Sequence, residues 1–272
     1  MSAVATQTPQ PPLRVTQARV ALSEWTKLWS LRSTRWSLFV TLLLTIGLPL
    51  LVATILSSHW GQMSPGEQAS HHPLEVALVG VAIGELAIGV LGVLVISGEY
   101  STGMIRATMT AVPKRLPVLW AKAGVFGAVT FALTLPAVLI AFFASQAILA
   151  RHDILQISLS SPGATRVVIG GALYLTVTGV FALALGAIVR NTAGGIASFV
   201  GILFVIPPLM NVLPASWNNA ISPYLPINAG TEIFTLNPGS GNLSTWAGFG
   251  LYCGYTAALL AVAAVLIARR DT

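Results

Sequence analysis

Ionisable side chains are scarce in this sequence, so each one is a candidate for chemistry. Asp, Glu, Lys and Arg make up only 8% of the 272 residues. Glu85 lies inside a long apolar run, where an acidic group costs about 2.5–3.5 kcal/mol on insertion scales unless it faces protein or water. We therefore predict two alternative roles for Glu85. It either lines a translocation path, where it could be sensitive to protons, or bonds to a neighbouring helix.

The ionisable residues match no catalytic or metal-binding pattern. His and Glu gather in the stretch 58–73, but Gly and Pro interrupt it and the spacing does not match an HExxH helix. A P-loop needs Gly-Lys-Ser/Thr, whereas Lys27, Lys114 and Lys122 follow Thr, Pro and Ala. No set of nucleophile, base and acid occurs at membrane depth. We predict no catalytic residue, cofactor site or metal site on this chain, and hence no enzyme.

A concentrated polar patch, GEYSTGMIRATMTAVPKRLPVLWAKA, covers Gly98–Ala123 with five charged residues and two prolines. Ser101 and Thr102 can cap a short helix that Pro113 ends. Its small apolar face would consist of Met104, Ile105, Thr108 and Met109. Such a face suits a groove on another protein. We predict a docking helix, with a merely solvated loop as the alternative.

Six apolar runs must position these residues. They cover about 36–57, 74–97, 118–144, 166–189, 193–213 and 244–268. Each is near or above the roughly 20 residues that cross a bilayer. Only helices and closed barrels satisfy their backbone in lipid, and these uniformly apolar runs lack the alternation of barrel strands. The predicted fold is an all-α membrane protein with six transmembrane helices.

The basic residues predict the orientation of these helices. If the amino terminus is inside, only Arg151 and Arg166 of the 14 Lys and Arg residues lie outside. This distribution follows the positive-inside rule and places both termini in the cytoplasm. Topology thus explains the net charge of +6, and we predict no nucleic-acid partner. Lys122, at the start of the third span, is expected to extend its ammonium group to the inner headgroups.

The flanking segments complete the predicted organisation. Residues 1–12 are polar and rich in proline, which predicts a disordered tail before a single transmembrane domain at 13–272. Residues 14–34 are predicted to form an amphipathic helix along the inner leaflet, because apolar residues recur every three or four positions. These are Val15, Ala18, Leu22, Trp25 and Trp29. The external segment 214–243 is predicted to be re-entrant, with one or two short helices.

Small residues predict where the helices pack closely. In the second span, Gly80 and Gly84 are four residues apart, and Gly89 and Gly92 lie on the same side as Glu85. In the fourth span, small residues recur every seven positions at Ala172, Gly179 and Gly186. Small side chains let helix backbones approach each other, so we predict a close-packed seam on each helix.

Four segments resemble the permease subunits of bacterial type-2 ABC exporters. They are SEWTKLWSLRSTRWSL, GVLVISGEYSTGMIRATMTAVPKRLPVLWAKA, GALYLTVTGVFALALGAIVRNTAGGIA and ISPYLPINAG. The similarity extends over nearly the whole chain, and the second segment is its most specific part. The resemblance implies that the helix at 14–34 is an elbow helix and that region 98–117 holds a coupling helix. It implies contact with a separate ATP-binding subunit at Glu99, Tyr100, Ser101, Thr102, Gly103, Met104, Ile105 and Arg106.

The resemblance also implies an assembly. Two copies of the permease, expected to be a homodimer, would work with two ATP-binding subunits in the lipid of a bacterial cytoplasmic membrane. ATP and Mg would bind to those partner subunits. The residues alone leave two alternatives open, a secondary transporter or channel, and a sensory membrane subunit that moves no substrate. Neither the residues nor the resemblance selects a substrate.

Overall fold

The structure is a computed structural model that describes residues 16–101, 103, 116–237, 239 and 241–269. These residues form helices and connecting turns only. Six helical segments among them are long and apolar enough to cross a membrane: Arg32–Gln62, Pro73–Ser101, Leu116–Ala150, Ala164–Val189, Thr192–Met210 and Thr245–Arg269. The prediction of an all-helical transmembrane architecture with six spans is therefore confirmed.

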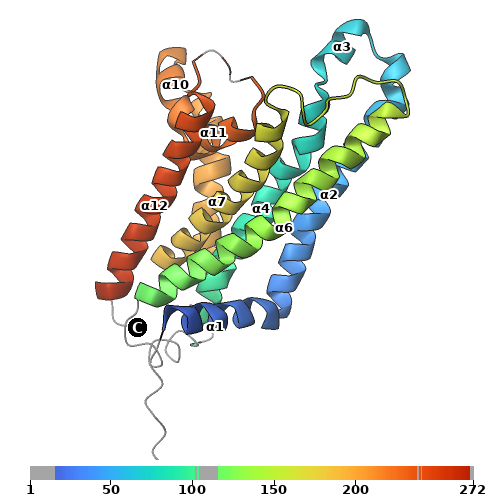
Figure 1. Cartoon of the computed structure of the whole chain (residues 1–272). Coiled ribbons are helices and arrows are strands. Elements are labelled where there is room, and N and C mark those ends of the chain that lie inside the picture. Colours follow the sequence, from blue (N-terminus) through green and yellow to red (C-terminus); the bar gives the residue numbers. More distant parts are fainter. Residues whose placement is uncertain (1–15, 102, 104–115, 238, 240, 270–272) are drawn as a thin grey trace, which may run out of the picture.

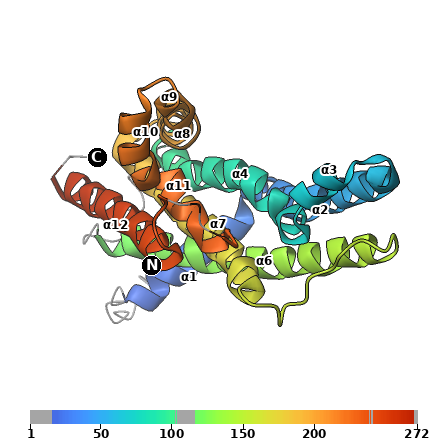
Figure 2. The same ribbon diagram turned by 90° about the horizontal axis from the view of Figure 1, so that it is seen from above.

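Helix α7 (Ala164–Val189) lies at the centre of the bundle. It packs against α4 (Pro73–Ser101), α6 (Leu116–Ala150), α8 (Thr192–Val200) and α12 (Thr245–Arg269) (Figure 2). Its buried side chains include Tyr174, Leu175 and Phe181. Most side chains of α7 are buried, so this helix needs no polar face.

Glycines set how closely α4 and α7 approach. A Cβ at Gly92 of α4 would overlap the carbonyl oxygen of Gly179 in α7. A Cβ at Gly186 would lie 3.0 Å from the carbonyl oxygen of Val93. Of the small residues predicted to form seams, Gly92 of α4 and Gly179 and Gly186 of α7 lie at this crossing, where backbone contacts backbone. Gly80, by contrast, faces α2 (Arg32–His59), where its Cβ would lie 2.7 Å from the carbonyl oxygen of Leu44.

Helix α6 extends beyond the apolar run at 118–144 and ends at Ala150. The side-chain amide of Gln146 donates to the carbonyl of Pro73 at 3.1 Å and accepts from the amide of Ile157 at 3.0 Å. A buried polar side chain with both partners satisfied costs little, so the helix need not stop there.

The fifth span is interrupted where its prolines predict a break. Arg190 ends α7 in the left-handed conformation, and the side chain of Asn191 caps α8 by accepting from the amide of Gly194 at 2.9 Å. A π-helical turn, η2 (Gly201–Val205), then joins α8 to α9 (Ile206–Met210). Pro207 and Pro208 cannot donate to the preceding turn, which explains a wider turn at this place.

A short helix, α1 (Gln17–Ser30), lies across one end of the bundle (Figure 1). Val20 and Leu28 are buried on one face, and Val20 packs against Val118 and Ala121 of α6. Leu22, Trp25 and Trp29 are exposed on another face. The Arg269 end of α12 lies at the same end of the bundle as α1.

Short helices cover the opposite end (Figure 1). One is α3 (Pro65–Ser70), which follows the turn η1 (Trp60–Gln62). The others belong to segment 214–243: α10 (Ala215–Ile221), η3 (Ser222–Tyr224), α11 (Pro226–Thr231) and η4 (Glu232–Phe234). A Cβ at Gly230 would lie 2.7 Å from Tyr252 and 2.8 Å from Tyr174. Because glycine has no Cβ, α11 can pack closely against α7 and α12 at this position.

Candidate functional site

Four charged side chains meet beneath α1, at the end of the bundle where α4 stops and α6 begins. We call Glu24, Lys27, Glu99 and Lys122 the charge cluster. Lys27 Nζ lies 2.8 Å from Glu24 Oε1 and 3.0 Å from Glu99 Oε1, and Lys122 Nζ lies 2.8 Å from the same Glu99 oxygen. Lys122 also pairs with Glu24 Oε2. Each ammonium group thus contacts both carboxylates.

Three helices, α1, α4 and α6, supply the residues of the charge cluster. Glu24 and Lys27 are three residues apart on α1, which places them on one face. Glu99 lies two residues before the end of α4, and Lys122 lies in the second turn of α6. Residues 102–115 connect α4 to α6. The ion pair between Glu99 and Lys122 therefore links the last turn of α4 to the start of α6. Lys27 and Glu24 of α1 bind these two residues.

The cluster is buried and electrically balanced. Glu24, Glu99 and Lys122 are 2%, 6% and 3% exposed, so none of them could remain charged here without a partner at low cost. Burial alone would lower the pKa of Lys27, but the hydrogen bond and charge of Glu24, together with Glu99, raise it above 10.5. Lys27 stays protonated at neutral pH, and the contribution of its charge to stability is lost only as pH rises through that raised pKa.

This arrangement corrects the expectation for Lys122. Its ammonium group does not extend to headgroups but points inward to two carboxylates. The physical reason is that α1 and α4 bring Glu24 and Glu99 within reach, and a direct ion pair at low exposure satisfies the ammonium. Glu24 was not among the predicted site residues. A signal existed, since Glu24 and Glu99 are the only acidic residues of the described chain on the predicted inner side.

The other residues assigned to partner contact divide into two groups. Tyr100 is half-buried, with the Arg190 guanidinium 5.3 Å from its ring centre, while Ser101 and Gly103 are exposed. Thr102, Met104, Ile105 and Arg106 lie outside the described residues, as do most of region 98–117 and the predicted tail at 1–12. Glu99 is engaged within the chain, whereas Ser101, Gly103 and Leu116 are exposed in the described part of this region.

A second polar group lies deep in the bundle. Glu85 is 3% exposed and accepts a hydrogen bond from the hydroxyl of Tyr174 in α7. The Tyr174 ring stacks on Tyr252 of α12 with centres 5.6 Å apart, and Tyr252 donates to the hydroxyl of Thr178 at 3.0 Å. Of the two predicted roles, this is a bond to a neighbouring helix. The role of Glu85 as a lining residue of a translocation path stays a prediction.

Metal-ligand types do not converge within the described ranges, where no three His, Cys, Asp or Glu residues gather. Glu67 instead caps α3, accepting from the amide and hydroxyl of Ser64 at 2.8 Å each. These hydrogen bonds lower the pKa of Glu67 below 4.5. The local sequence Ser64-Pro-Gly-Glu67 is thus a capping box, which explains this acidic residue without a metal.

A comparison of the sequence with models of protein families gives no match, and a comparison with curated proteins gives none either.

Proposed function

We propose that this chain is the membrane-spanning permease subunit of an ATP-driven type-2 ABC exporter. Two copies would form the translocation path in a bacterial cytoplasmic membrane, with α1 as the elbow helix and both termini in the cytoplasm. Two separate ATP-binding subunits, holding ATP and Mg, would dock on region 98–117. The resemblance of the sequence supports this proposal, and so do the six helices of spanning length.

The charge cluster is the observation that carries the proposal. A partner that pushes on residues 102–115 would act on the ends of α4 and α6, and Glu99 and Lys122 tie these ends together. Glu24 and Lys27 add α1 to the same unit. A force on the connection would therefore move α1, α4 and α6 together. A buried ion network at this place is suited to transmit motion from an ATPase.

The same end of α4 is also tied to the other half of the bundle. The Ser97 hydroxyl lies 2.9 Å from that of Thr192 at the start of α8. Tyr100 faces the Arg190 guanidinium, which also donates to the carbonyl of Leu266 in α12 at 3.2 Å. A displacement of α4 would thus be transmitted to α8 and α12 through these contacts of Ser97 and Tyr100.

The assembly can be tested by purifying the tagged chain from its membranes in mild detergent and identifying its partners and their stoichiometry by mass spectrometry. We expect one ATP-binding subunit per permease. Reproducible absence of such a subunit from folded, dimeric chain would contradict the proposal and favour a secondary transporter, a channel or a sensory subunit.

The contact surface can be tested by cross-linking. Cys253 is the only cysteine, so it is first replaced by Ser. Ser101→Cys, at the α1 end, is then compared with Ser58→Cys, which is exposed at the opposite end. We expect a short cross-linker to join the ATP-binding subunit to position 101 and not to position 58. Equal labelling of both positions would remove the assigned contact. Arg106→Glu should lower the ATPase activity of the complex while membrane insertion stays intact.

A further inference from the structure

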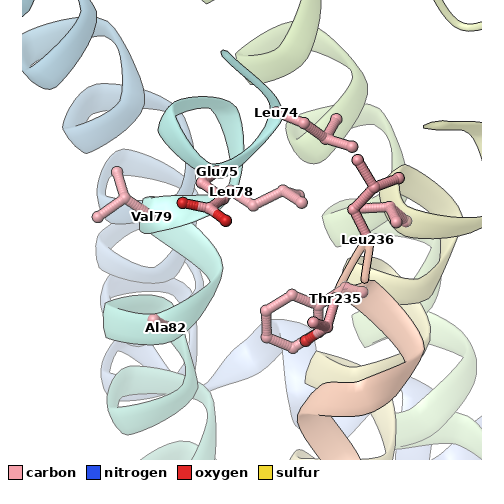
Figure 3. A pocket seen from close by; sticks show the side chains of 9 residues that line it. Leu74, Glu75, Leu78, Val79, Ala82, Thr235 and Leu236 are labelled. Atoms are coloured by element: carbon pink, nitrogen blue, oxygen red, sulfur yellow. The ribbon is translucent and has the colours of Figure 1, made fainter. Parts of the chain in front are cut away.

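A cavity of about 310 Å³ opens at the end of the bundle opposite α1 (Figure 3). One wall is the first part of α4, where Leu74, Leu78 and Ala82 recur at helical spacing. The facing wall is the stretch Phe234–Leu236, which ends η4 and continues beyond it. Most of the lining is apolar, and the volume is at the lower end of the roughly 300–1,000 Å³ of ligand pockets.

The wall opposite α4 is held firmly in place. The half-buried guanidinium of Arg166 donates to the carbonyl oxygens of Ile233, Thr235 and Leu236 at 3.1, 3.0 and 3.2 Å. Ile233, which precedes this wall, is fully buried. The positive charge of Arg166 is therefore used in bonding backbone carbonyls, and the cavity is preformed instead of a gap between mobile loops.

Glu75 is the single ionisable residue that lines the cavity. In Figure 3 its carboxylate lies beside the Leu78 side chain, on the part of α4 that faces Thr235 and Leu236. Its side chain forms no ion pair or hydrogen bond with any described residue. Its place in the first turn of α4 suits an acidic residue. An unpaired carboxylate at an apolar cavity attracts a cation that also carries apolar surface.

We propose that this cavity binds a small amphipathic cation, with an ammonium group at Glu75 and an apolar chain along Leu78 and Ala82. The volume equals that of about ten water molecules at roughly 30 Å³ each. This matches one short alkyl or aryl chain and is too small for both chains of a phospholipid. The ammonium could belong to a free amphiphile or to a lipid headgroup, and the experiment below separates these sources. The site goes beyond the proposed transport function, since binding to this chain requires no ATPase.

Binding is measured with tritiated octyltrimethylammonium on the purified chain in a maltoside detergent. We expect one saturable site, displaced by the unlabelled cation and not by octanesulfonate, which has the same chain and the opposite charge. Glu75→Gln should weaken binding about fivefold, the effect of losing one solvent-accessible ion pair. Glu67→Gln, the matched control on an exposed carboxylate outside the cavity, should leave affinity unchanged.

A second variant tests the apolar part of the site. Ala82 is exposed at the edge of the cavity, so Ala82→Phe should fill the cavity without disturbing the packed core, and should abolish saturable binding while thermal unfolding stays unchanged. Added phosphatidylethanolamine that displaces the probe from wild type, and less effectively from Glu75→Gln, would support the site and identify a lipid headgroup as its source. The proposal is overturned if wild type shows no saturable binding, if Glu75→Gln binds like Glu67→Gln, or if octanesulfonate competes as well as the cation.

Discussion

Removing one cation from the charge cluster should destabilise the folded chain strongly. Lys122→Met keeps the length of the side chain but leaves Glu24, Glu99 and Lys27 with a net charge of −1 in a buried site. Coulomb's law at an effective dielectric constant of about 20 gives roughly 6 kcal/mol for the pair of Lys122 Nζ and Glu99 Oε1 at 2.8 Å. Desolvation of the ammonium offsets part of this energy. We therefore predict a loss of about 3–5 kcal/mol in the free energy of unfolding.

A second substitution should recover part of that loss. In Lys122→Met/Glu99→Gln the remaining Glu24 and Lys27 form a neutral pair 2.8 Å apart. Because the uncompensated charge is gone, the double variant should be more stable than the sum of the two single effects predicts. We expect a coupling energy of about 1–3 kcal/mol between the two positions.

The measurement is equilibrium unfolding in mixed micelles of maltoside and dodecyl sulfate, followed by helical circular dichroism. Arg151→Met is the control, because Arg151 is exposed just beyond the other end of α6, and its change should stay within about 0.5 kcal/mol. If Lys122→Met is no less stable than Arg151→Met, or if the two cluster substitutions are additive, the cluster does not tie α4 to α6.

Three further predictions concern the rest of the bundle. Tyr174→Phe removes the hydroxyl bound to Glu85 and should cost about 1–3 kcal/mol in unfolding free energy, more than Tyr252→Phe, because a buried carboxyl loses its donor. Gly230→Ala should cost about 1–3 kcal/mol by overpacking the two tyrosines at 2.7 and 2.8 Å, while Gly254→Ala, which meets no atom within 4 Å, should not destabilise. Burial raises the pKa of Glu232 above 4.5 against the hydrogen bond from Asn242, so the folded state holds its proton more tightly and stability falls as pH rises from 4.5 through that raised pKa. Glu232→Gln should flatten this decline in melting temperatures measured from pH 4 to 7, and an unchanged profile would contradict it.

The six spans could be predicted from the sequence because they depend on local patterns. Run length and apolarity determine which segments can cross a membrane. Glycine spacing also predicted close packing, and Gly92 and Gly179 do meet at the crossing of α4 and α7. The length of α6 beyond the apolar run at 118–144 could not be predicted, because the partners of Gln146 are the carbonyl of Pro73 and the amide of Ile157. No local pattern shows that a polar side chain will be satisfied by residues elsewhere in the chain.

The charge cluster at the candidate site could not be predicted from local sequence patterns either. Glu24 and Lys122 are 98 residues apart, and Lys27 and Glu99 are 72 apart. Each residue taken alone has an ordinary local explanation: Glu24 as a polar position on α1, and Lys122 as a cation at a span end. Only the packing of α1 against α4 and α6 brings them together. The scarcity of acidic residues on the predicted inner side was the one available sign that those present have specific partners.

Helix α4 takes part in the charge cluster, in the close contact with α7 and in the wall of the cavity. Its last turn holds Glu99 in the charge cluster, its middle packs on α7 at Gly92, and its first turns form one wall of the cavity. The opposite wall is bonded to Arg166 in α7. Because α4 and α7 touch backbone to backbone, we expect a displacement of α4 to carry α7 with it, so that both walls of the cavity move together. Lys122→Arg, which keeps the charge of the cluster, should therefore leave octyltrimethylammonium binding unchanged even if the altered geometry of the cluster weakens coupling to an ATPase.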